Sequence, residues 1–138
     1  MNNKLFVDTS FVIGLVNDKD QYHEKALTFS YEFNNASLVT TDAVLFEIGN
    51  SLAKDFKQEA TKIIKVLRES ENVDVITVER DLFDKAFELY QKYNDKDWGL
   101  VDCISFVVMR EQNITDALTS DKHFVQAGFR ALMLDLEN

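Results

Sequence analysis

Short apolar runs and longer stretches with helical spacing alternate along this chain. The runs are rich in β-branched and aromatic residues, and they predict strands at residues 4–8, 36–40, 73–78, 115–119 and 130–134. Apolar residues three or four positions apart predict helices at about residues 11–16, 21–33, 42–54, 57–68, 81–93 and 100–111. Short strands separated by helices predict crossover connections and parallel pairing. We therefore expect an α/β fold.

The predicted strands contain few polar positions, which is typical of strands that are covered by helices on both faces. The expected architecture is a three-layer α/β/α sandwich around a central, mostly parallel sheet of about five short strands. A length of 138 residues suits one domain over residues 1–138, and 46% hydrophobic residues support a true core. Proline is absent and glycine occurs four times, so no linker is evident.

Cysteine content and charge bear on the cellular location of the protein and on the partners that it can bind. Cys103 is the single cysteine, no signal-peptide pattern opens the sequence, and no segment has the length of a membrane span. We therefore expect a cytoplasmic protein with no membrane association. The net charge of −9 argues against a basic surface that coats nucleic acid. It does not exclude an enzyme whose acids hold metal ions, because bound cations reverse the local charge.

Four acids fall where the predicted topology brings chain segments together. Asp8 ends the first predicted strand, and Asp121 lies two residues beyond the strand at 115–119. Glu47 lies about two turns into the helix after the second strand, and Asp102 lies in the first turn of the helix at 100–111. Ligands of open parallel sheets bind beyond the carboxyl ends of the strands. We expect the four carboxylates at that edge.

The surroundings of these acids favour a metal site. Asp8, Glu47 and Asp102 stand among apolar residues, where a carboxylate is costly unless it is paired or binds a cation. Oxygen ligands of this kind suit Mg²⁺ or Mn²⁺. Each acid also has a structural explanation. Asp8 and Asp121 could cap helices, Glu47 could be solvated, and Asp102 could interact with a helix dipole. A purely structural interpretation requires all four explanations to be correct for residues that we expect at the same edge of the sheet. It is therefore weaker than any one of the explanations alone.

Four segments that contain these acids resemble the motifs of PIN-domain nucleases. They occur in the family's order and cover essentially the whole chain: residues 7–10 (VDTS), 46–50 (FEIGN), 98–106 (WGLVDCISF) and 118–124 (LTSDKHF). The sequence is most similar to bacterial VapC-like toxin ribonucleases. The resemblance implies an endoribonuclease that depends on Mg²⁺ or Mn²⁺ and hydrolyses RNA phosphodiester bonds. It also implies a toxin of a type II toxin–antitoxin pair, with an antitoxin protein as partner, and a homodimer.

The resemblance assigns roles to individual residues of this chain. Asp8, Glu47, Asp102 and Asp121 match the catalytic acidic quartet, with Glu47 binding the metal directly or through water. Thr119 matches the hydroxyl residue that precedes the last acid by two positions.

Other polar residues near the quartet are expected to support it. We expect Thr119, and also Thr9, Ser10 and Asn50, to hydrogen-bond the metal-binding carboxylates. Asp97, five residues before Asp102, could extend the acidic cluster, although a surface loop acid is the simpler interpretation. We expect His123 to be structural.

Two other functions are compatible with parts of the pattern. An aspartate at the end of the first strand also occurs in haloacid-dehalogenase-type phosphatases, but that chemistry needs a second acid where this chain has Ser10. A non-catalytic PIN-like module that binds protein or RNA is the other alternative. The intact quartet speaks against it.

Overall fold

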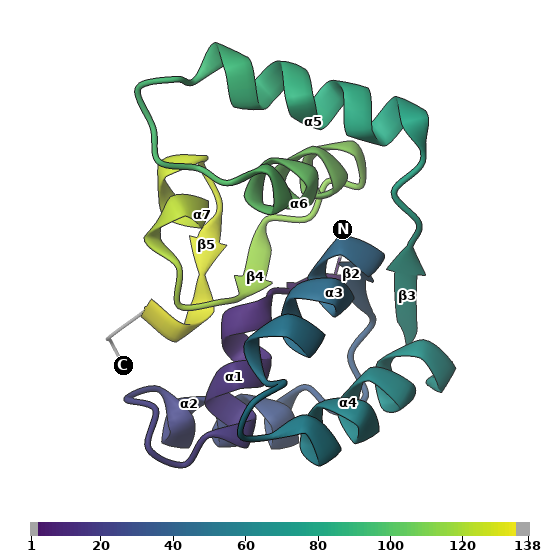
Figure 1. Cartoon of the computed structure of the whole chain (residues 1–138), viewed down its shortest axis with the longest axis vertical. Coiled ribbons are helices and arrows are strands. Elements are labelled where there is room, and N and C mark those ends of the chain that lie inside the picture. Colours follow the sequence, from purple (N-terminus) through teal and green to yellow (C-terminus); the bar gives the residue numbers. More distant parts are fainter. Residues whose placement is uncertain (1–2, 135–138) are drawn as a thin grey trace.

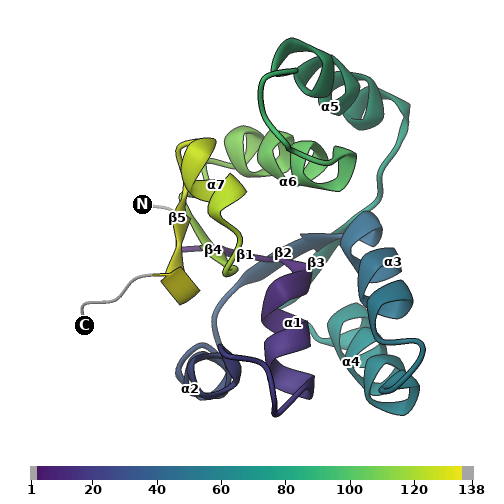
Figure 2. The same cartoon turned by 60° about the vertical axis from the view of Figure 1, so that its left-hand side comes forward.

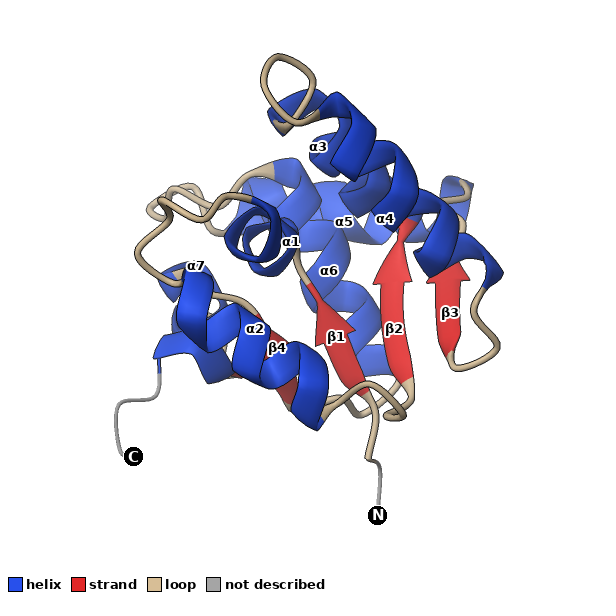
Figure 3. Cartoon of the chain, turned by 90° about the horizontal axis from the view of Figure 1, so that it is seen from below, coloured by secondary structure: helices blue, strands red, loops and turns tan. Residues whose placement is uncertain are grey.

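The computed structural model describes residues 3–134 of the chain, and it contains one parallel sheet (Figure 1). The spatial order of the strands is β3-β2-β1-β4-β5, and all four pairings are parallel. The strands are β1 (Leu5–Val7), β2 (Leu38–Thr41), β3 (Val73–Ile76), β4 (Asp116–Leu118) and β5 (Arg130–Ala131). The arrowheads of β1, β2 and β3 point the same way in Figure 3. The expected α/β fold with a parallel sheet is confirmed.

Helices cover both faces of the sheet, as Figure 2 shows. In that view α1, α2 and α4 lie on one side, and α6 lies on the other with α5 packed outside it. The helices are α1 (Thr9–Val16), α2 (His23–Glu32), α3 (Asp42–Ser51), α4 (Lys57–Glu69), α5 (Arg80–Lys92), α6 (Leu100–Glu111) and α7 (Lys122–Gln126). No helix within residues 3–134 is long and apolar enough to cross a membrane.

The pairing of β1 with β4 brings two distant chain segments together at the carboxyl edge. Val7 is in register with Leu118, and the backbone N–H of Asp8 donates to the Leu118 carbonyl at 3.2 Å. On the other side, the Thr40 hydroxyl of β2 donates to the Val7 carbonyl at 2.8 Å. The end of β1 is therefore held from both neighbouring strands.

Three phenylalanines tie this part of the sheet to the helices above it. Phe6, Phe106 and Phe124 are fully buried. The rings of Phe106 and Phe124 meet edge to face with centroids 5.0 Å apart, and Phe6 lies 6.3 Å from Phe124. Burial of each ring contributes roughly 1.5–3 kcal/mol. This contact fixes α6 and α7 relative to β1.

The predicted elements differ from the structure mainly at their ends. The predicted strand at 130–134 is wrong in its second half, because only Arg130 and Ala131 pair with β4 and residues Leu132–Leu134 form a 3₁₀ helix. That turn buries Leu132 and Met133, which an extended strand would point to opposite faces. The predicted helix at 42–54 ends earlier, at Ser51, whereas the helix at 100–111 is confirmed with the same bounds.

Candidate active site

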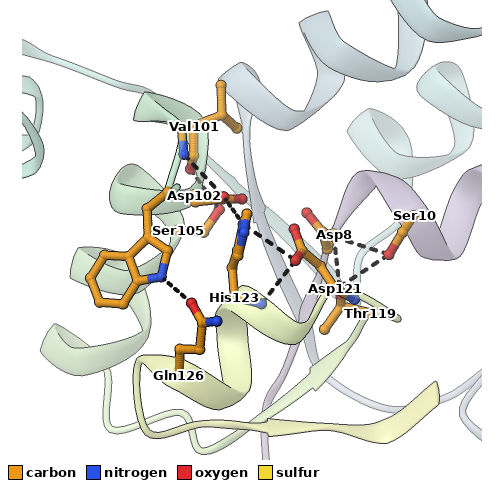
Figure 4. A network of polar contacts seen from close by, with 11 residues as sticks. Asp8, Ser10, Val101, Asp102, Ser105, Thr119, Asp121, His123 and Gln126 are labelled. Carbon is orange, nitrogen blue, oxygen red and sulfur yellow. Dashed lines mark hydrogen bonds and ion pairs between the residues drawn. The ribbon is translucent and has the colours of Figure 1, made fainter. Parts of the chain in front are cut away.

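Asp8 is a buried carboxylate at the carboxyl end of β1 (Figure 4). It occupies the position before α1, yet its side chain does not cap that helix. Its Oδ2 instead accepts hydrogen bonds from the Thr119 hydroxyl at 2.7 Å and the Ser10 hydroxyl at 3.0 Å. The carboxylate is thus oriented by the first turn of α1 and by the residue that follows β4.

The two hydroxyl groups around Asp8 are themselves held in place. They lie 3.0 Å from each other. The backbone N–H of Ser120 donates to Ser10 Oγ, and that of Asp121 donates to Thr119 Oγ1, both at 3.0 Å. This network connects the segment after β1 with the segment after β4.

Glu47 reaches the site from α3. The helix begins where the Thr41 hydroxyl accepts a hydrogen bond from the Val44 N–H at 3.2 Å and so caps the helix. Oε1 of Glu47 accepts a hydrogen bond from the Thr9 hydroxyl at 2.8 Å. This bond joins α3 to the first residue of α1.

Asp102 and Asp121 enter from α6 and from the end of β4. Oδ2 of Asp102 accepts from the Gly99 backbone N–H at 3.2 Å and lies 2.9 Å from Nδ1 of His123. Asp121 caps α7, since its Oδ1 accepts from the His123 backbone N–H at 2.9 Å. The same oxygen lies 3.4 Å from His123 Nδ1. One ligand atom each from Asp102, Asp121 and His123 lie within 4.8 Å of one another.

The hydrogen bonds follow a common pattern in all four acids. Within residues 3–134, one oxygen of each carboxylate accepts a hydrogen bond, from a side chain or, in Asp121, from a backbone N–H, and no side chain donates to the second oxygen. The oxygens left over are Asp8 Oδ1, Glu47 Oε2, Asp102 Oδ1 and Asp121 Oδ2. Such a set of oxygens fits a hard divalent cation.

Burial makes the ionised acids unfavourable on their own. Desolvation raises the pKa of Asp8 although Thr119 and Ser10 donate to it, and the charge of Asp121 adds to the increase. Desolvation likewise raises the pKa of Glu47 and of Asp102, with further increases from neighbouring acids. Among the described residues, no Lys or Arg forms an ion pair with the quartet. A divalent cation would supply the missing positive charge.

Only some of the residues that we expected to support the four acids contact them in the structure. Thr9, Ser10 and Thr119 each donate to a carboxylate of the quartet. Asn50 and Asp97 are exposed, and within the described range neither side chain forms a hydrogen bond or an ion pair. The structure therefore brings four acids and three hydroxyls together and leaves Asn50 and Asp97 outside.

His123 lies in the site, where the sequence interpretation expected a structural residue. Its ring stands between Asp102 and Asp121 (Figure 4). The sequence contained one indication of this position, since His123 follows Asp121 by two residues. An acid that caps a helix accepts a hydrogen bond from the backbone N–H two residues later, which brings that residue close to the acid. The contact with Asp102 links residues 21 positions apart and could not be read from the sequence.

The chain matches the family model for the PIN domain over residues 5–130. It belongs to the PIN-domain family, which confirms the resemblance of the four acidic motifs. The haloacid-dehalogenase alternative is thereby set aside. Ser10, where that chemistry needs an acid, donates a hydrogen bond to Asp8.

Curated relatives and a solved structure narrow the similarity within the family. The chain is 32% identical over 125 residues to the 23S rRNA-specific endonuclease VapC20 of two Mycobacterium tuberculosis strains, CDC 1551 / Oshkosh and ATCC 25618 / H37Rv. The alignments cover 91% of this chain and 95% of the relatives. The crystal structure of M. tuberculosis VapC20, a Sarcin-Ricin loop cleaving toxin, superposes with a TM-score of 0.81 at 31% identity. That comparison covers 91% of this chain and 95% of the other.

Proposed function

We propose that this PIN-domain protein is a metal-dependent endoribonuclease that hydrolyses RNA phosphodiester bonds. The observation that carries the proposal is the convergence of four carboxylates from separate segments, each with one oxygen held by the protein and one available. The 32% identity to an rRNA endonuclease over nearly the whole chain supports the same activity.

The roles proposed for the acids follow from their positions. Asp8, Asp102 and Asp121 would hold Mg²⁺ or Mn²⁺ through the oxygens that their hydrogen bonds leave available. When bound, the cation supplies Lewis-acid activation of a water and neutralises charge on the phosphodiester. Thr119 and Ser10 keep Asp8 in one orientation, so the site needs little rearrangement to bind its ligand.

Glu47 is proposed as the residue that orients the attacking water and accepts its proton. It approaches from a helix rather than from a strand end, and its Oε2 has no side-chain donor within the described residues. Burial and the charges of Asp102 and Asp121 raise its pKa, which moves this carboxylate toward the basicity that proton transfer near neutral pH requires. Thr9 holds Oε1 and thereby directs Oε2.

We propose a structured ribosomal RNA hairpin as the substrate to test first. The curated relatives are 23S rRNA-specific, and the solved structure is of a toxin that cleaves the Sarcin-Ricin loop. The net charge of −9 argues that general attraction to phosphate contributes little. Recognition of RNA shape at a narrow site fits this charge better than sequence-independent binding does.

An antitoxin protein and a second copy of the chain are the proposed partners, and a cytoplasmic location fits both. An apolar cavity of about 250 Å³ lies among α1, α2 and α4 and is suited to an apolar segment of another protein. On α5, Phe83, Phe87 and Tyr90 are between 42% and 45% exposed and form a row of stacked rings. Such a row supports a homodimer, which light scattering of the purified protein tests.

The decisive assay incubates the purified protein with structured and unstructured RNAs in Mg²⁺, Mn²⁺ or EDTA. We expect cleavage of a hairpin substrate with either metal and none in EDTA. Asp8→Asn should lack this activity, which excludes a contaminating nuclease. Cleavage that persists in EDTA, or in Asp8→Asn, would contradict the proposal.

A PIN-like module that binds RNA or protein without cutting is the alternative function. It predicts no cleavage across broad substrates and no Mn²⁺ binding by calorimetry. The toxin role has its own test, which is arrest of growth on expression and its relief by a small protein encoded beside this gene.

A further inference from the structure

The imidazole of His123 lies between two of the four acids, and both of its neighbours are carboxylate oxygens. Nδ1 is 2.9 Å from Asp102 Oδ2 and 3.4 Å from Asp121 Oδ1 (Figure 4). The side chain is only 20% exposed. An ionised carboxylate oxygen accepts hydrogen bonds and cannot donate them, so Nδ1 carries a hydrogen in this contact.

The position of this ring is fixed by the packing of α7. The His123 backbone N–H donates to Asp121 Oδ1 at 2.9 Å. The Trp98 indole N–H, just before α6, donates to Gln126 Oε1 at 2.9 Å. Phe124, the next residue along α7, is buried against Phe106 of α6 with ring centroids 5.0 Å apart. The short helix therefore presents His123 to α6 in one orientation.

A comparison among the four acids indicates what the ring does. The Thr9 hydroxyl engages one oxygen of Glu47, and the Ser10 and Thr119 hydroxyls engage one oxygen of Asp8. Within residues 3–134, His123 is the one side chain in polar contact with Asp102 and Asp121: Nδ1 is at hydrogen-bonding distance from Asp102 Oδ2, and it lies 3.4 Å from Asp121 Oδ1. The other donors to these two acids within residues 3–134 are backbone N–H groups. Gly99 N–H donates to Asp102, and His123 N–H donates to Asp121.

We propose that His123 is a positioning residue of the metal site. Its Nδ1–H donates to Asp102 Oδ2 and lies beside Asp121 Oδ1, so that Asp102 Oδ1 and Asp121 Oδ2 are left to bind the divalent cation. This inference rests on the proposed function, because it requires that both acids bind metal. Two carboxylates brought together repel each other. An N–H group that donates to one and lies beside the other reduces this repulsion and restricts the rotation of the carboxylate that accepts the hydrogen bond.

Mn²⁺ titrations of the full-length protein by calorimetry test the proposal with three substitutions. Asn places an amide nitrogen close to the position of Nδ1, Gln reaches instead toward Nε2, and Ala removes the donor. His123→Ala should weaken Mn²⁺ binding roughly ten- to a hundredfold, as expected for a group that orients metal ligands. His123→Asn should restore most of the affinity, and His123→Gln should resemble His123→Ala.

Val125→Ala is the matched control, because Val125 is an exposed residue on the same short helix. It should bind Mn²⁺ as the wild type does. Thermal unfolding of each metal-free variant checks that α7 still packs, and the contrast between the Asn and Gln variants stays informative if the Ala variant unfolds. Pulsed electron paramagnetic resonance of bound Mn²⁺ should show no directly coordinated nitrogen from His123.

Three results would overturn the assignment of a positioning role. Unchanged affinity in His123→Ala would show that the ring is dispensable, and tighter binding would show that it competes with the metal. A coordinated nitrogen that disappears in His123→Ala would make the ring a ligand instead. Absence of Mn²⁺ binding in the wild type would contradict the proposed function itself. If the wild type binds Mn²⁺ and His123→Ala binds it equally well, only the role of His123 is contradicted.

Discussion

Asp8 and Glu47 belong to the same acidic site, but they are held in different ways. Asp8 lies at a strand end, is buried, and has one oxygen engaged by two hydroxyls that are themselves fixed by backbone N–H groups. Glu47 lies on a helix, is less buried, and has one side-chain hydrogen bond, from Thr9.

This difference between Asp8 and Glu47 suits the first to binding the metal and the second to proton transfer. A rigid, desolvated carboxylate such as Asp8 is suited to holding a cation in one place, because its geometry is set before the ligand arrives. A helix-borne carboxylate with one anchored oxygen, such as Glu47, can still rotate its second oxygen toward a water and take up a proton. The comparison predicts that substitutions in the two regions fail in different ways.

Replacing Asp8 should have the largest effect on activity. Asp8→Asn keeps an oxygen for the Thr119 and Ser10 hydroxyls but removes the charge that binds metal. We expect Mn²⁺ binding to be lost and cleavage to fall about a thousandfold or more, since metal activation is worth several kcal/mol. Calorimetry and gel-based cleavage measure both. Wild-type metal affinity in this variant would refute the division of roles.

Replacing Glu47 should separate the two roles. Glu47→Gln should lower kcat by roughly 10²–10⁴-fold, the range for loss of a general base. Mn²⁺ affinity should change far less than in Asp8→Asn, because Gln keeps an oxygen in the same place. Single-turnover cleavage at saturating Mn²⁺ gives the rate. If the loss of rate disappears when more metal is added, Glu47 acts as a ligand and not as a base.

The supporting hydroxyls allow the same comparison with a matched pair of substitutions. Thr119→Val removes the donor to Asp8 and the acceptor for the Asp121 N–H, and it should weaken metal binding roughly ten- to a hundredfold. Thr9→Val removes the donor to Glu47 and should lower kcat while leaving metal affinity nearly unchanged. Equal effects of the two substitutions on affinity would mean that the two regions act as one unit.

The pH dependence of stability should be the smallest effect and depends on the same buried acids. Burial raises the pKa of Asp8, Glu47 and Asp102 in the folded state. A folded-state pKa above the unfolded value means that protonation favours the fold. This stabilisation is complete below the unfolded pKa and is lost as the pH rises through the folded pKa.

Metal-free protein should accordingly lose stability as the pH rises above the unfolded pKa values of these acids, 3.8 for Asp8 and Asp102 and 4.5 for Glu47. Mn²⁺ should restore most of it at higher pH by compensating the ionised carboxylates. Urea unfolding at each pH, with and without the metal, measures the change. In Asp8→Asn the pH-dependent part should shrink, and a larger dependence there would contradict the burial argument.

The sequence by itself determined the architecture, and it predicted that four acids lie at one edge of the sheet. Asp8 and Asp121 follow apolar runs, and Asp102 lies in a segment with helical spacing. These patterns were enough to predict a parallel sheet with acids at one edge. These features are local, because strand period, helix period and caps depend on residues close together in the chain. The helix at 100–111 has the predicted bounds for that reason.

Only the tertiary structure decided how the acids are oriented and which neighbours reach them. The hydrogen bonds from Thr119 to Asp8 and from Thr9 to Glu47 join residues 111 and 38 positions apart. His123 entered the site, whereas Asn50 and Asp97 stayed exposed outside the network. Sequence spacing fixes which face of a helix a residue occupies. The packing of Phe6, Phe106 and Phe124 sets where that helix lies over the sheet, and so which side chains meet at the four carboxylates.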